Sequence, residues 1–348
     1  MKAGVFHYFR DIRYEDIEDI KLEKGDKFDV LVKVRAAGVC GSDIGHFTGK
    51  FGDPLPKGSI LGHELCGEVV EIGENVTNVK VGDRVGIEPL IGCGHCSFCL
   101  QGDYYLCNNL RHIGYYYPGG FAEYTKAPHE KVFKLPDNVS FEEASTLDCY
   151  AVAVHGLNIV PVNVGDTIVV YGAGPAGLCM AQAVKAAGVK NVIIIDVIDG
   201  VLEVSKKAGI ELAFNSTKVD VYEKVMELTG GRGADIVFDS AGGHAPILDT
   251  AVRMLRPRGT LAIVGMRSDM PFDSLAAHFK EIEIKFVFSY GYWNYKTEFE
   301  IALDLISTGK INAKPLVTHK FELKDIDKAF TAALDKKASN AVKVVVIP

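Results

Sequence analysis

Hydrophobic and polar positions divide the chain into two regions of different character. Up to about residue 150, short apolar runs such as 30–34 and 67–73 are separated by Gly and Pro, which is typical of a β-rich domain with many loops. From about residue 165, apolar runs of strand length alternate with helical segments. This alternation predicts a parallel sheet with helices on both faces. The predicted strands cover 167–171, 191–196, 236–239 and 260–265, and the predicted helices cover 177–187, 201–208 and 245–255.

The regular alternation stops near residue 290. Helices are expected over 297–307 and 325–334, and a last strand over 341–347. All apolar runs are far shorter than the ~20 residues that cross a bilayer, so no membrane segment is expected. The first ten residues lack the basic start, apolar centre and cleavage site of a secretion signal. A cytoplasmic protein is therefore expected.

Composition narrows the class of protein. The chain has 348 residues, of which 48% are hydrophobic and 24% charged, with a net charge of −7. These values exclude a disordered chain and favour two packed domains. No block of like charge is present, so neither a nucleic acid nor an anionic membrane is expected as a partner. The expected partner is a small-molecule substrate.

Four of the eight cysteines share one short loop, with the spacing Cys93-x2-Cys96-x2-Cys99-x7-Cys107. Four thiolates joined by short turns can surround one ion tetrahedrally, as a closed structural zinc site requires. An iron–sulfur cluster is the rival, because such runs also hold clusters, and unligated or disulfide-bonded cysteines are a third possibility. No Cys-Pro follows the loop, and structural zinc is the favoured reading.

A glycine-rich turn follows the predicted strand 167–171. Gly172 permits a tight turn, Gly174 lets the backbone approach a pyrophosphate, and Gly177 lets helix and strand pack closely. The next strand ends in Asp196, 19 residues after Gly177, near the ~20 expected for an acid that binds the adenosine ribose. An acid there would repel a 2′-phosphate, so NAD is favoured over NADP; the alternative is that Asp196 only caps a turn. The whole turn reads Gly172-Ala173-Gly174-Pro175-Ala176-Gly177.

A third set of candidate residues is dispersed over the first region. Taken singly, a Cys is most often a small core residue and a His after Gly most often satisfies a turn. The neighbouring four-cysteine loop and nucleotide motif strengthen the interpretation of the set as a metal site. The candidates are Cys40, Ser42, His63, Glu64 and Asp148.

Together these motifs resemble the zinc-dependent medium-chain dehydrogenases, most closely the polyol branch with sorbitol and galactitol-1-phosphate dehydrogenases. The resemblance covers nearly the whole chain in order. It rests on the four-cysteine loop, the glycine-rich turn and the segments Cys40-Gly41-Ser42-Asp43, Gly62-His63-Glu64, Gly119-Gly120-Phe121-Ala122-Glu123-Tyr124 and 148–155.

The resemblance implies an α/β protein in which a Rossmann doubly wound parallel sheet is inserted into a β-rich, GroES-like catalytic domain. The catalytic domain would comprise residues 1–152 and a returning segment, 291–348, with the NAD-binding domain at 153–290. Cys40 and His63 would hold a catalytic zinc, joined directly or through water by Glu64 and Asp148. Each subunit would then bind two zinc ions.

The chain also departs from that family's pattern. Gly45 stands where many polyol relatives have His, so the role of the following His46 is open. Cys149-Tyr150 replaces the usual Pro-Leu after the carboxylate. Residues 289–295 contain no Arg, although sorbitol enzymes tend to show an Arg-Tyr pair there. The exact substrate, phosphorylated or not, is therefore left open.

The expected activity is reversible oxidation of a secondary alcohol, a sugar alcohol or its phosphate, to the ketone with NAD. A zinc ion with an open position lowers the pKa of the bound alcohol, and Ser42 would take the proton first, unless it only caps a helix near Asp43. Alternatives are a threonine-type amino-alcohol or simple secondary alcohol as substrate, a zinc-free quinone reductase, or a non-catalytic NAD or zinc sensor. By analogy with relatives, a homodimer or homotetramer is expected.

Overall fold

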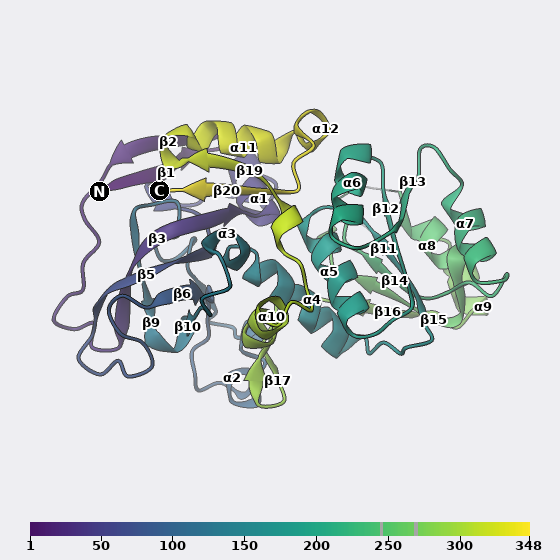
Figure 1. Ribbon diagram of the computed structural model, residues 1–348, viewed down its shortest axis with the longest axis horizontal. Coiled ribbons are helices and arrows are strands. Elements are labelled where there is room, and N and C mark those ends of the chain that lie inside the picture. The colour runs from purple at the N-terminus through teal and green to yellow at the C-terminus, as the bar shows by residue number, and fades with distance from the viewer. Residues whose placement is uncertain (244–245, 268–270) are drawn as a thin grey trace. The chain divides into compact units, whose positions relative to one another are not determined.

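The computed structural model describes residues 1–243, 246–267 and 271–348 (Figure 1). By contacts the chain divides into two compact units. The first unit comprises Met1–Asp148, Asn294–Ser307 and Val317–Pro348, and the second comprises Cys149–Trp293 and Thr308–Leu316. The short segment Thr308–Leu316 thus packs with the second unit, which the boundary expected at 290/291 does not anticipate.

The first unit is built on a seven-stranded sheet in the order β10-β6-β5-β3-β20-β19, with β9 also paired to β3. A three-stranded sheet, β2-β1-β4, and the two-stranded pair β7-β8 accompany it. The strands are β1 (Lys2–Tyr8), β2 (Asp11–Asp16), β3 (Asp29–Val39), β4 (Ser59–Ile60), β5 (Glu64–Ile72), β6 (Arg84–Ile87), β7 (Leu90–Ile91), β8 (Arg111–His112), β9 (Tyr124–Pro128), β10 (Val132–Lys134), β19 (Val317–Glu322) and β20 (Lys343–Ile347).

Helices of the first unit are mostly short and lie between these strands. They are α1 (Gly41–Thr48), α2 (Ser97–Gln101), α3 (Phe141–Ala144), α10 (Glu298–Ser307), α11 (Ile326–Leu334) and α12 (Lys336–Ser339). The helix α4 (Leu147–Ile159) begins at the end of this unit and continues into the second.

In the first unit, strands near the C-terminus pair with strands from the N-terminal region. Strand β20 pairs antiparallel with β3, with Val344 opposite Val39, and β19 pairs parallel with β20. The β3 strand in turn pairs with β5, with Gly38 opposite Glu64. This register places the start of β20, the end of β3 and the start of β5 in one row.

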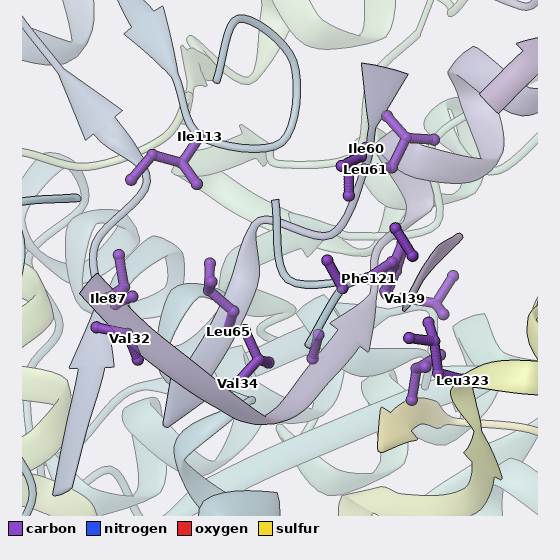
Figure 2. Packing of buried hydrophobic residues seen from close by; sticks show 14 of the residues in the cluster. Val32, Val34, Val39, Ile60, Leu61, Leu65, Ile87, Ile113, Phe121 and Leu323 are labelled. Carbon is purple, nitrogen blue, oxygen red and sulfur yellow. The ribbon is translucent and has the colours of Figure 1, made fainter. Parts of the chain in front are cut away.

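Apolar side chains from the long strands fill the core of the first unit. Figure 2 shows Val32 and Val34 of β3 in the same cluster as Leu65 of β5 and Leu323, which comes from the returning C-terminal segment. All of these side chains are buried. The alternating apolar positions of the N-terminal region and the late segment therefore form one hydrophobic core.

The second unit is a six-stranded sheet in the order β13-β12-β11-β14-β15-β16, and every pairing is parallel. This is the strand order of a Rossmann sheet, the architecture that the resemblance implies, with its topological switch point between β11 and β14. The strands are β11 (Thr167–Tyr171), β12 (Asn191–Asp196), β13 (Leu212–Asn215), β14 (Ala234–Asp239), β15 (Leu255–Ile263) and β16 (Glu283–Phe286). The helices are α5 (Pro175–Ala186), α6 (Asp199–Lys207), α7 (Val221–Leu228), α8 (Leu248–Met254) and α9 (Ser274–Phe279).

The structure refines several predicted bounds. The glycine-rich turn leads into α5 at Pro175 rather than at Gly177, because Pro is well suited to the first helical position. The strand predicted over 260–265 begins at Leu255, and the helix predicted over 245–255 is α8, which begins at Leu248; Ala245 lies outside the described residues. None of the helices among the described residues is long and apolar enough to span a membrane.

Candidate metal centres and cofactor site

The four cysteines of the short loop lie together in the first unit. Their sulfur atoms all lie within 4.8 Å of one another, with 4.0 Å between Cys93 Sγ and Cys99 Sγ and 3.8 Å between Cys96 Sγ and Cys107 Sγ. Backbone N–H groups of His95 and Cys96 lower the pKa of the Cys93 thiol to about 6, whereas burial raises the pKa of the Cys99 thiol to about 12, so Cys93 is the thiolate that forms first. The donor set and its spacing fit a tetrahedral zinc ion whose four positions are all filled by protein.

A buried network of polar side chains connects this loop to the neighbouring sheet. Glu88 Oε1 accepts hydrogen bonds from Tyr104 Oη at 2.5 Å and from Lys131 Nζ at 2.9 Å, and Lys131 Nζ lies 3.9 Å from the centre of the Tyr104 ring. A Cβ atom at Gly92 would lie 2.7 Å from Cys99 Sγ, so only glycine lets the chain pass the sulfur there. Tyr104 therefore ties the cysteine loop to the sheet through β6 and β10.

Cys40, His63 and Glu64 form a second group whose ligand atoms all lie within 4.8 Å of one another. Cys40 follows β3 and is the N-cap of α1, while His63 and Glu64 stand where β5 begins. A thiolate, an imidazole and a carboxylate are common zinc ligands, and three of them leave the fourth position open. Among the described residues this group does not include Asp148, so a direct role of Asp148 at the metal stays a prediction.

The returning strand β20 supplies a residue that the sequence analysis missed. Lys343 Nζ forms an ion pair with Glu64 Oε2, and both side chains are about 99% buried or more. A Cβ atom at Gly38 would lie 2.3 Å from Glu64 Oε2 and 2.7 Å from Lys343 Cε. Glycine at 38 therefore makes room for the pair. The only available signal was a single Lys in the apolar run of the last strand.

Asp43 is a second partner of the group. It is fully buried, its Oδ1 lies 3.4 Å from His63 Nδ1, and its Oδ2 accepts a hydrogen bond from Cys40 N at 2.9 Å. Burial alone would raise the pKa of Asp43, but His63 and the backbone N–H groups of Cys40 and Gly62 hold it below its usual value. A carboxylate beside Nδ1 would orient the imidazole so that Nε2 could bind a metal.

Ser42 lies in α1 and does not cap it, because Cys40 holds the N-cap position. The helix-cap alternative for Ser42 is therefore wrong. Instead Ser42 Oγ accepts a hydrogen bond of 2.8 Å from Tyr115 Oη, which also lies 3.3 Å from His63 Nδ1. The sequence analysis missed Tyr115, since a run of three tyrosines gives no sign of which one turns toward the metal ligands.

Two further histidines pack on the Tyr115 ring. The ring of His112 stacks on it at 4.6 Å and that of His46 lies tilted at 4.6 Å. Burial lowers the pKa of His112 to about 3 and also lowers the pKa of His46. Both rings are thus neutral near pH 7. With Tyr115 they form an aromatic cluster beside Ser42.

The glycine-rich turn has the shape that a dinucleotide phosphate requires. Gly172 has φ 92°, which favours glycine, and a Cβ atom at Gly177 would lie 1.7 Å from Gly172 O. Gly174 is the N-cap of α5, and Pro175 and Ala176 form its first turn. The cradle therefore fits a pyrophosphate against the N-terminus of α5.

Asp196 ends β12 beside this turn. Its Oδ2 accepts a hydrogen bond of 2.7 Å from Ala173 N, and its Oδ1 accepts from Val197 N at 2.7 Å and Ile198 N at 3.0 Å. The side chain thus organises two turns, as the alternative interpretation supposed. A contact from Asp196 to a ribose stays a prediction.

Residues 289–295, the segment without an Arg, contain both buried and exposed side chains. Tyr290 is buried, whereas Tyr292 is exposed and Tyr295 is 87% exposed at the tip of the hairpin between β17 (Tyr292–Trp293) and β18 (Lys296–Thr297). Asn294 adopts φ 60° in that turn. Tyr295 is thus the most exposed of the three tyrosines in this segment.

Comparison with known proteins matches the two parts of the chain to two dehydrogenase domain families. The alcohol dehydrogenase GroES-like domain family matches residues 26–137, and the zinc-binding dehydrogenase family matches residues 175–308. Sorbitol dehydrogenase of Bacillus subtilis is 35% identical over 100% of this chain and 97% of its own. D-xylulose reductase A of Aspergillus oryzae is 36% identical over 96% of this chain and 93% of its own.

Solved structures of dehydrogenases match this chain over its full length. Galactitol-1-phosphate dehydrogenase of Escherichia coli is 28% identical with a TM-score of 0.88, covering 100% of both chains. An alcohol dehydrogenase of Escherichia coli in complex with NADH is 30% identical with a TM-score of 0.87, covering 100% of this chain and 99% of its own. These findings confirm the fold class and the zinc and nicotinamide cofactors expected from the sequence. The chain belongs to the zinc-dependent medium-chain alcohol dehydrogenase family.

Proposed function

We propose that this protein interconverts a sugar alcohol, or a sugar-alcohol phosphate, and the corresponding ketone with NAD as the hydride acceptor. The observation that carries the proposal is the group of Cys40, His63 and Glu64 placed next to the Ser42 hydroxyl. Three protein ligands leave a position at which a substrate oxygen can bind. The four-cysteine loop has no such position and serves the fold.

The residues around the group can bind, orient and deprotonate an alcohol. When bound, zinc supplies Lewis acidity and NAD accepts hydride. Ser42 Oγ accepts a hydrogen bond from Tyr115 Oη, so one lone pair stays available to accept the proton of a substrate hydroxyl. Lys343 balances the charge of Glu64, and Asp43 holds His63. Asp148 would act on the ion directly or through water; if it binds directly, Glu64 would exchange with water or substrate so that one position stays open.

The substrate class rests on the relatives. Those named above act on sorbitol, D-xylulose and galactitol 1-phosphate, none of which is an amino-alcohol. NAD is preferred because Asp196 would repel a 2′-phosphate. We therefore place threonine-type and simple secondary alcohols second, and a non-catalytic sensor third.

A cytoplasmic homo-oligomer is also part of the proposal. All eight cysteines are free thiols, and thiolate metal sites persist in a reducing compartment. Strand β16 ends the parallel sheet of the second unit, and Phe286 at its end is 65% exposed. An edge of this kind can pair with a second copy. Sedimentation velocity would give the number of subunits.

A substrate panel tests the activity. The zinc-loaded protein is assayed with polyols, sugar-alcohol phosphates, threonine and simple secondary alcohols, each with NAD and NADP. We expect the highest kcat/KM for one polyol or polyol phosphate with NAD. A highest value for threonine or a simple alcohol would move the assignment to that class. Absence of turnover by protein that binds zinc and NADH would favour the sensor.

A further inference from the structure

The four-cysteine centre is open to solvent on one side. Cys93, Cys96 and Cys99 are only partly buried, whereas Cys107 is buried. Leu100, which follows Cys99 in α2, is 75% exposed. A chelator in solution can therefore approach the outer side of this centre. Retention of an ion against such a competitor depends on how firmly the ligands are held from the inner side.

Tyr104 lies on that inner side, beside two of the ligands. It begins the short 3₁₀ helix Tyr104–Leu106, and Cys107 N donates to Tyr104 O at 3.0 Å. A Cβ atom at Gly92 would lie 2.7 Å from Cys99 Sγ and 2.9 Å from Tyr104 Cβ. The Cys99 sulfur and the Tyr104 side chain therefore flank the same point over Gly92. A displacement of Tyr104 would displace both Cys99 and Cys107.

The Tyr104 side chain is held by two buried residues that adjoin strands of the sheet. Its Oη donates to Glu88 Oε1 at 2.5 Å, and Lys131 Nζ donates to the same oxygen at 2.9 Å. Glu88 N also donates to Lys131 O at 2.9 Å, where Glu88 follows β6 and Lys131 precedes β10. The exposed fractions are 0% for Glu88, 5% for Tyr104 and 8% for Lys131. The tyrosine hydroxyl is thus fixed to paired strands and not to the loop itself.

Stability alone does not account for three polar groups in this place. Within residues 1–243, 246–267 and 271–348, Glu88 Oε2 is buried and has no hydrogen-bond partner. A buried ion pair with an unsatisfied oxygen contributes little net stability, and apolar residues of similar volume often do as well or better. What the polar network provides is one fixed position for the tyrosine hydroxyl, and with it for the adjoining ligands.

We propose that Tyr104 is a positioning residue for the closed cysteine centre, and that its hydrogen bond to Glu88 slows the loss of zinc from this centre. When an outer cysteine detaches, Cys99 and Cys107 stay in place, so the detached thiolate rebinds the ion before a competitor does. Without the hydroxyl, the inner ligands separate more readily and zinc is lost sooner. This inference goes beyond the oxidoreductase function and rests on the closed zinc site described above.

The test follows each cysteine separately while zinc is removed. Zinc-loaded wild type, Tyr104→Phe and Tyr116→Phe are mixed with excess EDTA and iodoacetamide, and mass spectrometry records the alkylation of every cysteine with time. Tyr116 is the matched control, because its side chain is 64% exposed. We expect Tyr104→Phe to accelerate alkylation of the loop cysteines ~10-fold, and Tyr116→Phe less than ~2-fold. The loop cysteines are Cys93, Cys96, Cys99 and Cys107.

Cys40 provides an internal reference, since it belongs to the other centre. Its rate of alkylation should be the same in Tyr104→Phe as in the wild type. Acceleration of Cys40 together with the loop cysteines would show a general loosening of the fold and would overturn the inference. Circular dichroism checks the fold of Tyr104→Phe, which lacks one oxygen and retains the ring next to Lys131.

Failure of the zinc assignment gives a different result. If the loop cysteines of the wild type are alkylated as fast without EDTA as with it, and metal analysis finds no zinc bound to them, both the closed site and the inference are wrong. If EDTA is needed for alkylation of the wild type but Tyr104→Phe reacts at the same rate, the closed site stands and only the role of Tyr104 is overturned.

Discussion

Tyr115 shows how a single hydroxyl can prepare a site for catalysis. Its Oη donates to Ser42 Oγ, which orients the serine hydroxyl that would accept the substrate proton. We expect Tyr115→Phe to lower kcat/KM about 10-fold through the lost hydrogen bond, with Tm unchanged because the ring still packs between the two histidines. Steady-state kinetics and thermal unfolding check this. Tyr116→Phe, at an exposed neighbour, is the control, and an equal effect of both substitutions would contradict the role of Tyr115.

Asp196 has two candidate roles, binding the cofactor ribose and stabilising the glycine-rich turn. The second is visible in the structure, because its carboxylate accepts a hydrogen bond from Ala173 N. We expect Asp196→Ala to raise KM for NAD about 10-fold, and KM for NADP less, since the repulsion of a 2′-phosphate is removed. Cofactor kinetics check the ratio, with Asp199→Ala as a nearby acidic control. Equal losses for NAD and NADP would assign Asp196 to the turn alone.

At the scale of single elements, strand β20 places the charged side chain of Lys343 in the buried interior. In the zinc-free protein, Lys343→Met would leave the Glu64 carboxylate buried without its counter-ion, which costs about 3–5 kcal/mol of the free energy of unfolding. Urea unfolding measures it. Lys320→Met on the adjacent β19 breaks only an exposed pair with Glu142 and should cost less than ~1 kcal/mol. We expect Glu64→Gln to restore part of the loss in the double variant; no restoration would mean that the packing of Lys343, not its charge, matters.

At the amino ends of β11 and β14 in the parallel sheet, the Asp235 carboxylate forms contacts whose contribution to stability depends on pH. Burial alone would raise the pKa of Asp235, but hydrogen bonds from Arg232 and Arg256 lower it to about 2, and Thr167 N donates to it as well. A depressed carboxyl pKa adds stability above the unfolded pKa of ~3.9, and this stability is lost as the pH falls toward 2.

Asp235→Asn should therefore lower the free energy of unfolding by roughly 2 kcal/mol at pH 7, with the difference from the wild type shrinking below about pH 4. Urea unfolding over pH 7 to 3 measures both. Asp53→Asn, in an exposed loop, is the control. A difference that stayed constant across this range would show that the Asn packs badly rather than that a charge is lost.

Sequence patterns predicted the elements whose side chains repeat regularly. The parallel strands of the second unit and the glycine-rich turn were found because buried strands read as apolar runs and because a φ of 92° at Gly172 favours glycine. The contacts of Lys343 with Glu64 and of Tyr115 with Ser42 could not be read in this way, since each joins positions far apart in the chain. Such pairs depend on strand register and loop path, which periodicity does not encode.

For the whole molecule, the two cysteine-containing centres should separate activity from stability. We expect Cys40→Ala to lose one zinc and at least ~100-fold in activity with little change in Tm. Cys99→Ala should lose the other zinc and lower Tm by ~5 °C or more, because a closed site contributes to folding. Metal analysis, kinetics and thermal unfolding of both variants check this. Equal changes in Tm would contradict the division into one open and one closed centre.

The discontinuous first unit also sets an order of events during synthesis. Lys343 is translated 279 residues after Glu64, which at ~5–20 residues per second is a delay of about 14–56 s on the ribosome. The whole parallel sheet of the second unit emerges within that interval. The nascent chain must therefore keep the Glu64 carboxylate hydrated until β20 arrives, so the nucleotide-binding unit is free to fold before the N-terminal sheet can close.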